Sequence, residues 1–174
     1  GKKKVLLVCS GSIRLLGNFS KKLEELKTHL IRFSNFQPNP LYESVVEGVK
    51  LFREEACDAI IAVGGGSAMD VAKCIKLYSS LPGDGENGTW LKAESGSDNI
   101  PFLAMPTTAG TGSEATRYAV IYYEGTKQSV TSDNLIPGTV LMDSDVLRTL
   151  PLYQKKVTMM DALCHAVESF WSVN

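Results

Sequence analysis

Excess charge and long apolar runs are both missing from this 174-residue chain, and each absence excludes a class of protein. The 18 basic and 19 acidic side chains leave a net charge of -1, which predicts no broad positive surface for a nucleic-acid backbone. No apolar run approaches the roughly 20 residues of a membrane-spanning helix. The short run VLLVC after the basic residues 2–4 turns polar at Ser10, too early for a signal peptide. We therefore expect neither a nucleic-acid nor a membrane partner.

Cysteine is scarce and is not arranged as a bridge or a metal-binding pair. Cys9, Cys57, Cys74 and Cys164 are far apart, form no C-x-x-C motif and stand in apolar contexts. Disulfides occur mainly in secreted proteins, and thiolate zinc sites need closely spaced cysteines. The pattern predicts buried, reduced thiols in a cytoplasmic protein.

The composition that is present is that of an ordinary globular protein, with 44% hydrophobic and 21% charged residues. Such a chain can form one domain with a buried core and at most a small appendage. Apolar runs typical of buried strands alternate along it with segments of helical periodicity. Strands that alternate with helices predict an α/β fold, with a mostly parallel sheet covered by helices on both faces.

The expected elements can be placed by residue number. Apolar runs predict strands at 5–10, 58–63, 100–106 and 139–143, and periodicity predicts helices at 18–30, 42–56, 67–81 and 150–171. The first helix would carry His29 on its exposed surface. Residues 117–132 predict a hairpin that turns at Glu124 and Gly125, and residues 81–99 predict a loop. Pro151 suits a first helical turn, and a boundary near Leu150 would divide a domain of residues 1–150 from residues 151–174.

The richest chemical signal is AIIAVGGGSAMDVAK, in which three glycines join a buried strand to a helix. Glycine lets the backbone approach a ligand closely, and the free N–H groups at a helix start attract a phosphate. Gly64, Gly65, Gly66 and Ser67, the glycine loop, are the candidate contacts. The spacing matches neither a Walker A loop nor G-x-G-x-x-G, so it indicates an anion site without specifying the ligand.

Asp70 has two interpretations. It can belong to the anion site, or it can reach back to Ser67 as the partner in a capping box, which would explain both side chains structurally. The capping box is the favoured interpretation, because a carboxylate that points at a phosphate would repel it.

A second polar segment, PTTAGTGSEAT at residues 106–116, follows a predicted strand; we name it the threonine loop. It offers hydroxyls on Thr107, Thr108, Thr111 and Ser113 together with exposed backbone. A loop that merely turns the chain has a similar composition. Its place at a strand end, where α/β sheets collect their ligands, favours ligand contact.

A third signal is MDALCHAVESFW, in which Asp161 and His165 stand four residues apart on one helical face. Carboxylate and imidazole are standard metal donors, but even an open zinc site has three protein ligands. The alternative is an exposed pair worth about 0.2–0.5 kcal/mol. Glu168 is more consistent with a surface contact than with a third ligand.

Three stretches in this order, GGGSAMDVAK, PTTAGTGSEAT and DALCHAVE, resemble the iron-containing (group III) alcohol dehydrogenases, as does FQPNP. The resemblance implies a Rossmann-like dinucleotide-binding domain followed by an all-helical domain, with the active site between them. It implies a metal held by one Asp and three His, of which Asp161 and His165 would be the first two. The chain would then be the N-terminal portion of a longer enzyme, with residues 151–174 as the first helix of the helical domain.

The resemblance also assigns cofactor contacts. Gly65, Gly66 and Ser67 would hold the pyrophosphate of NAD(P), and Lys127 would contact a ribose. Thr107, Thr108 and Thr111 would line the adenine and ribose side, and Asn39 of the FQPNP loop would join the cofactor contacts.

One position departs from the pattern of many NAD-using members, which carry an Asp at the end of the first strand. Here Ser10 stands near that place. Without the carboxylate the 2′-phosphate of NADPH would be tolerated, with Ser10, Ser12 or Arg14 as candidate contacts.

The implied function is hydride transfer between nicotinamide and a small alcohol or aldehyde, with Fe or Zn as a Lewis acid. Within the family the last segments look most like phosphonoacetaldehyde reductases, and we expect a homodimer. Two alternatives remain open. One is a nucleotide-binding module without catalysis, and the other is an enzyme similar to glycerol dehydrogenase or dehydroquinate synthase.

Overall fold

The computed structural model describes residues 3–11, 13, 17–25, 28–93, 96 and 99–172. In chain order the elements are β1 (Lys4–Cys9), α1 (Gly17–Glu24), β2 (His29–Phe33), α2 (Tyr42–Glu54), β3 (Ala59–Gly64), α3 (Gly66–Tyr78), the 3-10 turn η2 (Glu86–Lys92), β4 (Phe102–Pro106), η3 (Ser113–Ala115), β5 (Tyr118–Tyr123), β6 (Thr126–Thr131), η4 (Asp133–Leu135), β7 (Thr139–Val140), α4 (Asp145–Arg148) and α5 (Leu152–Trp171).

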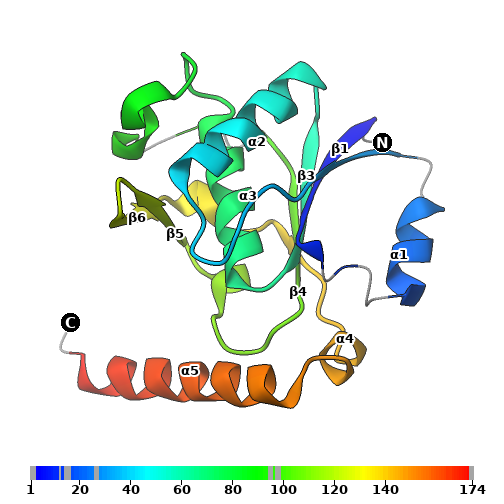
Figure 1. Ribbon diagram of the computed structural model, residues 1–174, viewed down its shortest axis with the longest axis vertical. Helices are drawn as coiled ribbons and strands as arrows, with labels where there is room; N and C mark the ends of the chain where they lie inside the picture. Colours follow the sequence, from blue (N-terminus) through cyan, green and yellow to red (C-terminus); the bar gives the residue numbers. More distant parts are fainter. Residues whose placement is uncertain are drawn as a thin grey trace.

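The centre of the molecule is a parallel sheet in the order β2-β1-β3-β4-β7. The strands β1 and β3 are apolar along almost their whole length because both of their faces are covered. Figure 1 shows α2 and α3 on one face of the sheet and α1 on the other. The fold is the Rossmann-like α/β architecture expected from the alternation of strands and helices.

Two apolar clusters hold these layers together. The larger lies between the sheet, α2, α3 and the β5–β6 hairpin, and includes Leu6, Val49 and Ile75. The smaller lies on the α1 face and includes Leu7 and Val63. Because alternate side chains of a strand point to opposite faces, neighbours such as Leu6 and Leu7 serve different clusters.

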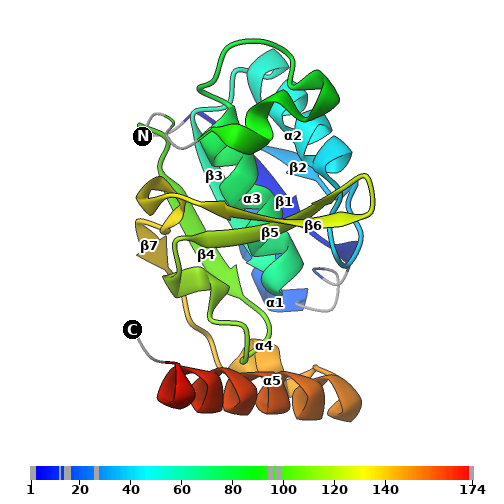
Figure 2. The same ribbon diagram turned by 90° about the vertical axis from the view of Figure 1, so that its left-hand side faces the viewer.

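The predicted hairpin is confirmed. Strands β5 and β6 pair antiparallel, and Glu124 and Gly125 at the turn have φ of 49° and 73°. Two successive residues with positive φ are the signature of a tight two-residue hairpin turn. The hairpin packs across α3, as Figure 2 shows. Ala119, Ile121 and Val130 supply its buried side chains.

Two sequence-based expectations are wrong. The first helix ends at Glu24, and His29 begins the edge strand β2, although its side chain is exposed as expected. Cys164 is exposed on α5, whereas Cys9, Cys57 and Cys74 are buried. The two errors are related, since both β2 at the edge of the sheet and α5 leave most of their side chains wholly or partly exposed, unlike the central strands and α3.

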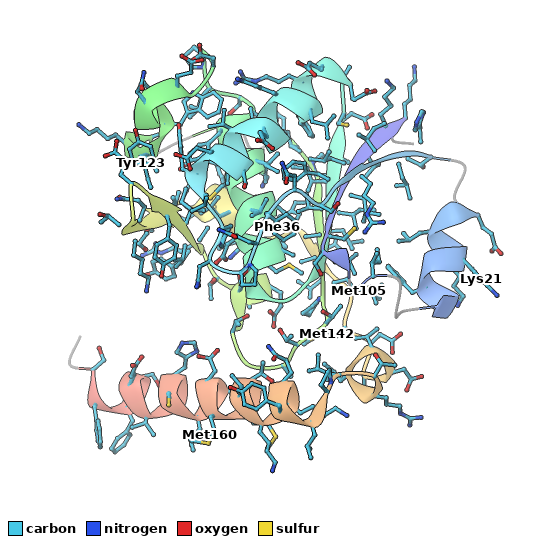
Figure 3. All side chains as sticks on the ribbon, in the orientation of Figure 1. Lys21, Phe36, Met105, Tyr123, Met142 and Met160 are labelled. Atoms are coloured by element: carbon cyan, nitrogen blue, oxygen red, sulfur yellow. The ribbon has the colours of Figure 1, made fainter. Side chains whose placement is uncertain are left out.

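Helix α5 begins directly after Pro151 and runs across the end of the molecule at the carboxyl edge of the sheet (Figures 1 and 2). Thr158 is its one buried residue in the described part of the chain. Figure 3 shows Met160 on the side of α5 that faces away from the sheet. Within the described residues no helix has both the length and the apolar character that crossing a membrane requires.

Candidate functional site

The strand order places a crevice between the carboxyl ends of β1 and β3. From β1 the chain moves to β2 on one side, and then crosses back to β3 on the other side. At such a switch point the loops after the two strands diverge to opposite faces, and open α/β sheets bind their ligands there. Ser10 follows β1 and Gly65 follows β3.

A cleft of about 520 Å³ opens at this point, within the usual size range of small-molecule sites. Among the described residues that line it, none has a charged side chain. The lining residues are Ser10, Phe36, Gln37, Pro38, Gly65, Gly66, Ser67, Ala68, Thr107, Thr108, Thr111, Val146, Thr149, Leu150, Pro151, Gln154 and Thr158. An anionic ligand in the cleft would therefore depend on backbone N–H groups and hydroxyls.

The glycine loop supplies such N–H groups. Helix α3 begins at Gly66, and its N-cap, Gly65, makes no side-chain capping bond. Within the described structure the N–H groups of Gly66 and Ser67 have no hydrogen-bond acceptor. The predicted capping box from Ser67 to Asp70 is wrong, because the helix starts at Gly66, two residues earlier than that motif requires. Free N–H groups and the positive end of the helix dipole are the features with which helix N-termini bind anions.

The threonine loop packs directly on the glycine loop. A Cβ added at Gly65 would lie 3.2 Å from Oγ1 of Thr108, and one added at Gly66 would lie 3.1 Å from Cγ2 of Thr111. The N–H of Thr107 donates to the carbonyl oxygen of Gly64 at 2.9 Å. A side chain at either glycine would thus press on a threonine of the neighbouring loop, and both loops line the same cleft.

Asp70 does not line the cleft, and its side chain binds the threonine loop. Its Oδ1 accepts a hydrogen bond of 2.9 Å from Oγ of Ser113. Burial raises the pKa of this carboxyl, and the hydrogen bond from Ser113 opposes the shift. Both side chains therefore connect α3 to η3, a role that neither sequence interpretation anticipated.

Lys73 is a contact that the sequence analysis missed, although it belongs to the quoted GGGSAMDVAK stretch. Its side chain is fully buried, and Nζ donates to the carbonyl oxygens of Thr116 and Tyr118 at 2.8 and 2.7 Å. Burial lowers the pKa of Lys73 to about 8, while the nearby Asp70 opposes the shift. The available sequence signal was the spacing of Asp70 and Lys73, which places the two charged side chains one turn apart on the same face of α3.

Helix α5 and the segment before it cover the cleft. Gly110 of the threonine loop touches α5 so closely that an added Cβ would lie 2.3 Å from the backbone oxygen of Thr158. Val146, Thr149, Gln154 and Thr158 form this cover. No motif in the sequence marks these four residues, and only the path of the chain brings them to the glycine loop.

Arg32 reaches the β1 end of the cleft from the neighbouring strand. A guanidinium nitrogen of Arg32, Nη2, donates to the carbonyl oxygen of Ser10 at 3.4 Å. Burial raises the pKa of the Cys9 thiol, and the Arg32 guanidinium opposes that shift. Of the other predicted contacts at this end, Ser12 and Arg14 lie outside the described residues.

Two further predicted contacts do not line the cleft. Asn39 has a φ of 58°, which asparagine tolerates, and its neighbours Phe36 to Pro38 line the cleft instead. Lys127 lies on the exposed strand β6, opposite Tyr122 in the hairpin.

Asp161 and His165 lie on α5, beyond the cleft. Oδ1 of Asp161 and Nε2 of His165 are 3.9 Å apart, with 43% and 54% of the two side chains exposed. That spacing suits two donors that share an ion after small side-chain rotations. Among the described residues no group of three metal-ligating side chains is present. The pair fits part of a metal site and needs at least one more protein ligand.

Comparison with known proteins gives consistent matches. The family model described as iron-containing alcohol dehydrogenase matches residues 1–144. An NAD-dependent methanol dehydrogenase of Bacillus methanolicus is 33% identical, and an NADPH-dependent butanol dehydrogenase of Clostridium saccharobutylicum is 34% identical, each over 98% of this chain. A solved 1,3-propanediol oxidoreductase superposes on 98% of the chain with a TM-score of 0.87 and 33% identity.

These proteins are longer than the chain described here. The chain covers 46% of each of the two relatives and 46% of the solved structure, so it spans about half of their length.

Proposed function

The chain belongs to the iron-containing alcohol dehydrogenase family, and from this premise we propose that it carries the nucleotide-binding part of an NAD(P)- and metal-dependent alcohol dehydrogenase or aldehyde reductase. The proposal rests mainly on one observation. The free N–H groups of Gly66 and Ser67 face a cleft that has no charged lining residue and lies at the switch point of the sheet. Residues 1–150 would form this nucleotide-binding domain, and residues 151–174 would begin a helical domain.

The cofactor would lie across the carboxyl ends of the strands. Gly65, Gly66 and Ser67 would bind the pyrophosphate through the backbone, because no cation lines the described cleft. Thr107, Thr108 and Thr111 would offer hydroxyls to the adenine and ribose side. Relatives named as NAD-dependent and as NADPH-dependent both match the chain, so the family match supports NAD(P) without separating the two.

The contacts assigned to Lys127 and Asn39 stay predictions, since neither residue lines the cleft. For Lys127 to contact a ribose of the cofactor, its side chain would have to extend further toward the cleft, or the β5–β6 hairpin would have to move when the cofactor binds.

Asp161 and His165 would hold the divalent metal, Fe or Zn, together with ligands beyond the described residues. When bound, the metal would supply a Lewis acid for the substrate oxygen and the nicotinamide would supply or accept the hydride. The cover formed by α4 and α5 would shield the cleft from water, through Val146 and Thr158 among others.

The substrate class proposed is small alcohols and aldehydes, in line with the methanol, butanol and propanediol named for the similar proteins. Phosphonoacetaldehyde stays a narrower prediction that would need a cation near the cleft. Lys155 and Lys156 lie on the first turns of α5, and Nζ of Lys155 donates to the carbonyl oxygen of Arg148 at 3.2 Å. A cytoplasmic homodimer also stays a prediction.

Titration with reduced dinucleotide, followed by nicotinamide fluorescence, tests the nucleotide site. We expect Gly66→Val to weaken binding by about tenfold or more, because its side chain would press on Thr111 and obstruct the N–H groups. Gly17→Val, at a glycine with no neighbour within 4 Å, is the matched control. Equal affinity of Gly66→Val and the unchanged protein would refute the site.

Measurements of bound metal and of catalytic turnover distinguish the proposed enzyme from a second candidate function, a nucleotide-binding module without catalysis. That candidate is favoured by the presence of only two adjacent metal donors among the described residues. For the enzyme, Asp161→Ala and His165→Ala should each lower bound metal and aldehyde reduction while dinucleotide binding persists. Dinucleotide binding without any metal uptake or turnover in the unchanged protein would support the module.

A further inference from the structure

We propose that Arg32 is a specificity-determining residue, whose guanidinium binds the 2′-phosphate of NADP(H) and gives the protein a preference for the phosphorylated dinucleotide. This inference rests on the proposed nucleotide site and adds a cofactor contact that sequence motifs do not identify.

The position of Arg32 follows from the pairing of β1 with β2. Arg32 lies opposite Leu7 in the parallel register, and its side chain extends toward the carboxyl edge, where Nη2 donates to the carbonyl oxygen of Ser10. Ser10 is itself part of the cleft lining. The guanidinium therefore lies one hydrogen bond away from the β1 end of the cleft.

The two ends of the site follow adjacent strands of the sheet. The anion-binding N–H groups follow β3, and Ser10 follows the adjacent strand β1, about 4.8 Å away in the hydrogen-bonding direction. A pyrophosphate at Gly66 would thus leave the neighbouring adenosine ribose within reach of the β1 end. A phosphate on the ribose 2′-oxygen would extend further in the direction of β2, where Arg32 lies.

Arg32 has donors to spare. A guanidinium carries five N–H donors, of which the long 3.4 Å bond to Ser10 uses one and the hydrogen bond to the Cys9 thiol uses another. Across the described residues no carboxylate forms an ion pair with Arg32, and the side chain is exposed. The planar fork matches a phosphate with two parallel bonds, which a lysine cannot reproduce.

Among the described residues that line this end of the cleft, none carries a carboxylate that would favour the unphosphorylated cofactor. A carboxylate that binds the ribose 2′-hydroxyl selects NAD and repels a 2′-phosphate, whereas an arginine nearby accommodates that phosphate. Ser10 is neutral, and the described cleft lining contains no Asp or Glu. Charge and hydrogen-bonding capacity at this place therefore both favour NADP(H).

The test compares affinities for NADPH and NADH, measured by nicotinamide fluorescence, in the protein and its variants. We expect the unchanged protein to bind NADPH more tightly. Arg32→Leu should weaken NADPH by about tenfold or more, the value of one charge-assisted hydrogen bond, and leave NADH within about twofold. Arg32→Lys should give an intermediate loss. Lys50→Leu, which removes an exposed cation from α2, is the matched control and should change neither affinity.

Ser10→Asp gives an independent result, because it adds a carboxylate beside Arg32 without removing the arginine. We expect its preference to shift to NADH.

Equal binding of both cofactors by the unchanged protein, or equal losses of affinity for both cofactors in Arg32→Leu, would overturn the role of Arg32 and leave the nucleotide site intact. Failure of the unchanged protein to bind either cofactor would overturn the proposed nucleotide site as well.

Discussion

At the scale of single residues, Lys73 shows how a buried charge can position a binding loop. Its Nζ donates to backbone oxygens on both sides of Arg117 and to Oγ1 of Thr116 at 3.1 Å, and thereby fixes the exit of the threonine loop to α3. A buried ammonium is costly unless such oxygens surround it. Asp70, one turn earlier, binds Ser113 at the middle of the same loop. The two side chains attach the loop to the helix whose first residues line the cleft.

The lowered pKa of Lys73 predicts how stability depends on pH. Burial lowers the pKa from 10.5 to about 8, so between these values the unfolded chain holds a proton that the folded protein has released. The free energy of unfolding contributed by Lys73 should therefore rise with pH from about 8 to 10.5, by at most about 1.4 kcal/mol per pH unit. The measurement is urea unfolding of the protein and of Lys73→Met across this range. A difference between the two that stays constant with pH would contradict the prediction.

Individual site residues differ in how far the sequence could predict them. The glycine and threonine loops were identifiable because Gly-Gly-Gly and Gly-Thr-Gly are unusual between apolar runs. Asp70 was assigned to a capping box because its spacing from Ser67 fits one, and only the start of α3 at Gly66 rules that out. The bond from Asp70 to Ser113 joins positions 43 residues apart, which local sequence patterns do not encode.

At the scale of elements, the contact between the threonine loop and α5 depends on one missing side chain. Gly110→Ala would place a methyl group 2.3 Å from the backbone oxygen of Thr158, and neither backbone can yield easily. We expect this variant to lose about 1–3 kcal/mol of stability and to bind dinucleotide more weakly, because α5 must shift away from the cleft. Thermal unfolding and cofactor titration would measure both effects.

Gly17→Ala is the matched control for that substitution. Gly17 is the first residue of α1 and has no atom within 4 Å of an added Cβ, so alanine there should be neutral or slightly stabilising. Similar stabilities for Gly110→Ala and Gly17→Ala would show that α5 is not held by this contact.

The elements themselves were predictable where both faces of a strand are buried. The apolar runs of β1 and β3 and the periodicity of α2, α3 and α5 gave their positions closely. Strand β2 was missed because it lies at the edge of the sheet, where HLIRF has only Phe33 fully buried and resembles the end of an amphipathic helix. The cover of the cleft escaped prediction for another reason: its residues become neighbours of the glycine loop only through the tertiary fold.

At the scale of the whole molecule, α5 exposes an apolar stripe. Met160, Leu163, Val167 and Phe170 recur at helical spacing and are 56%, 55%, 37% and 85% exposed. A surface of this kind on a globular protein marks an interaction site. Trp171, at 74% exposure, extends it.

We therefore expect the 174-residue chain to bind a hydrophobic dye and to associate as its concentration rises. Replacing Leu163 and Phe170 by lysine should reduce both effects several-fold, because the charges interrupt the stripe. Glu168→Lys, a change of charge at an exposed position on the same helix, is the control and should leave dye binding nearly unchanged. Dye fluorescence and light scattering would measure this, and equal dye binding by the double variant would argue against the stripe.

The position of Thr158 on α5 has one more consequence. Thr158 lines the cleft proposed to bind the nucleotide, and Asp161 follows it on the same helix by three residues, about 4.5 Å along the axis. A helix moves as a nearly rigid rod, so a displacement of Thr158 by a bound dinucleotide would be transmitted to Asp161. Linkage then requires reciprocity: if the dinucleotide changes the affinity for the metal, the metal changes the affinity for the dinucleotide by the same factor. In this way α5 would couple the occupancies of two sites that share no residue.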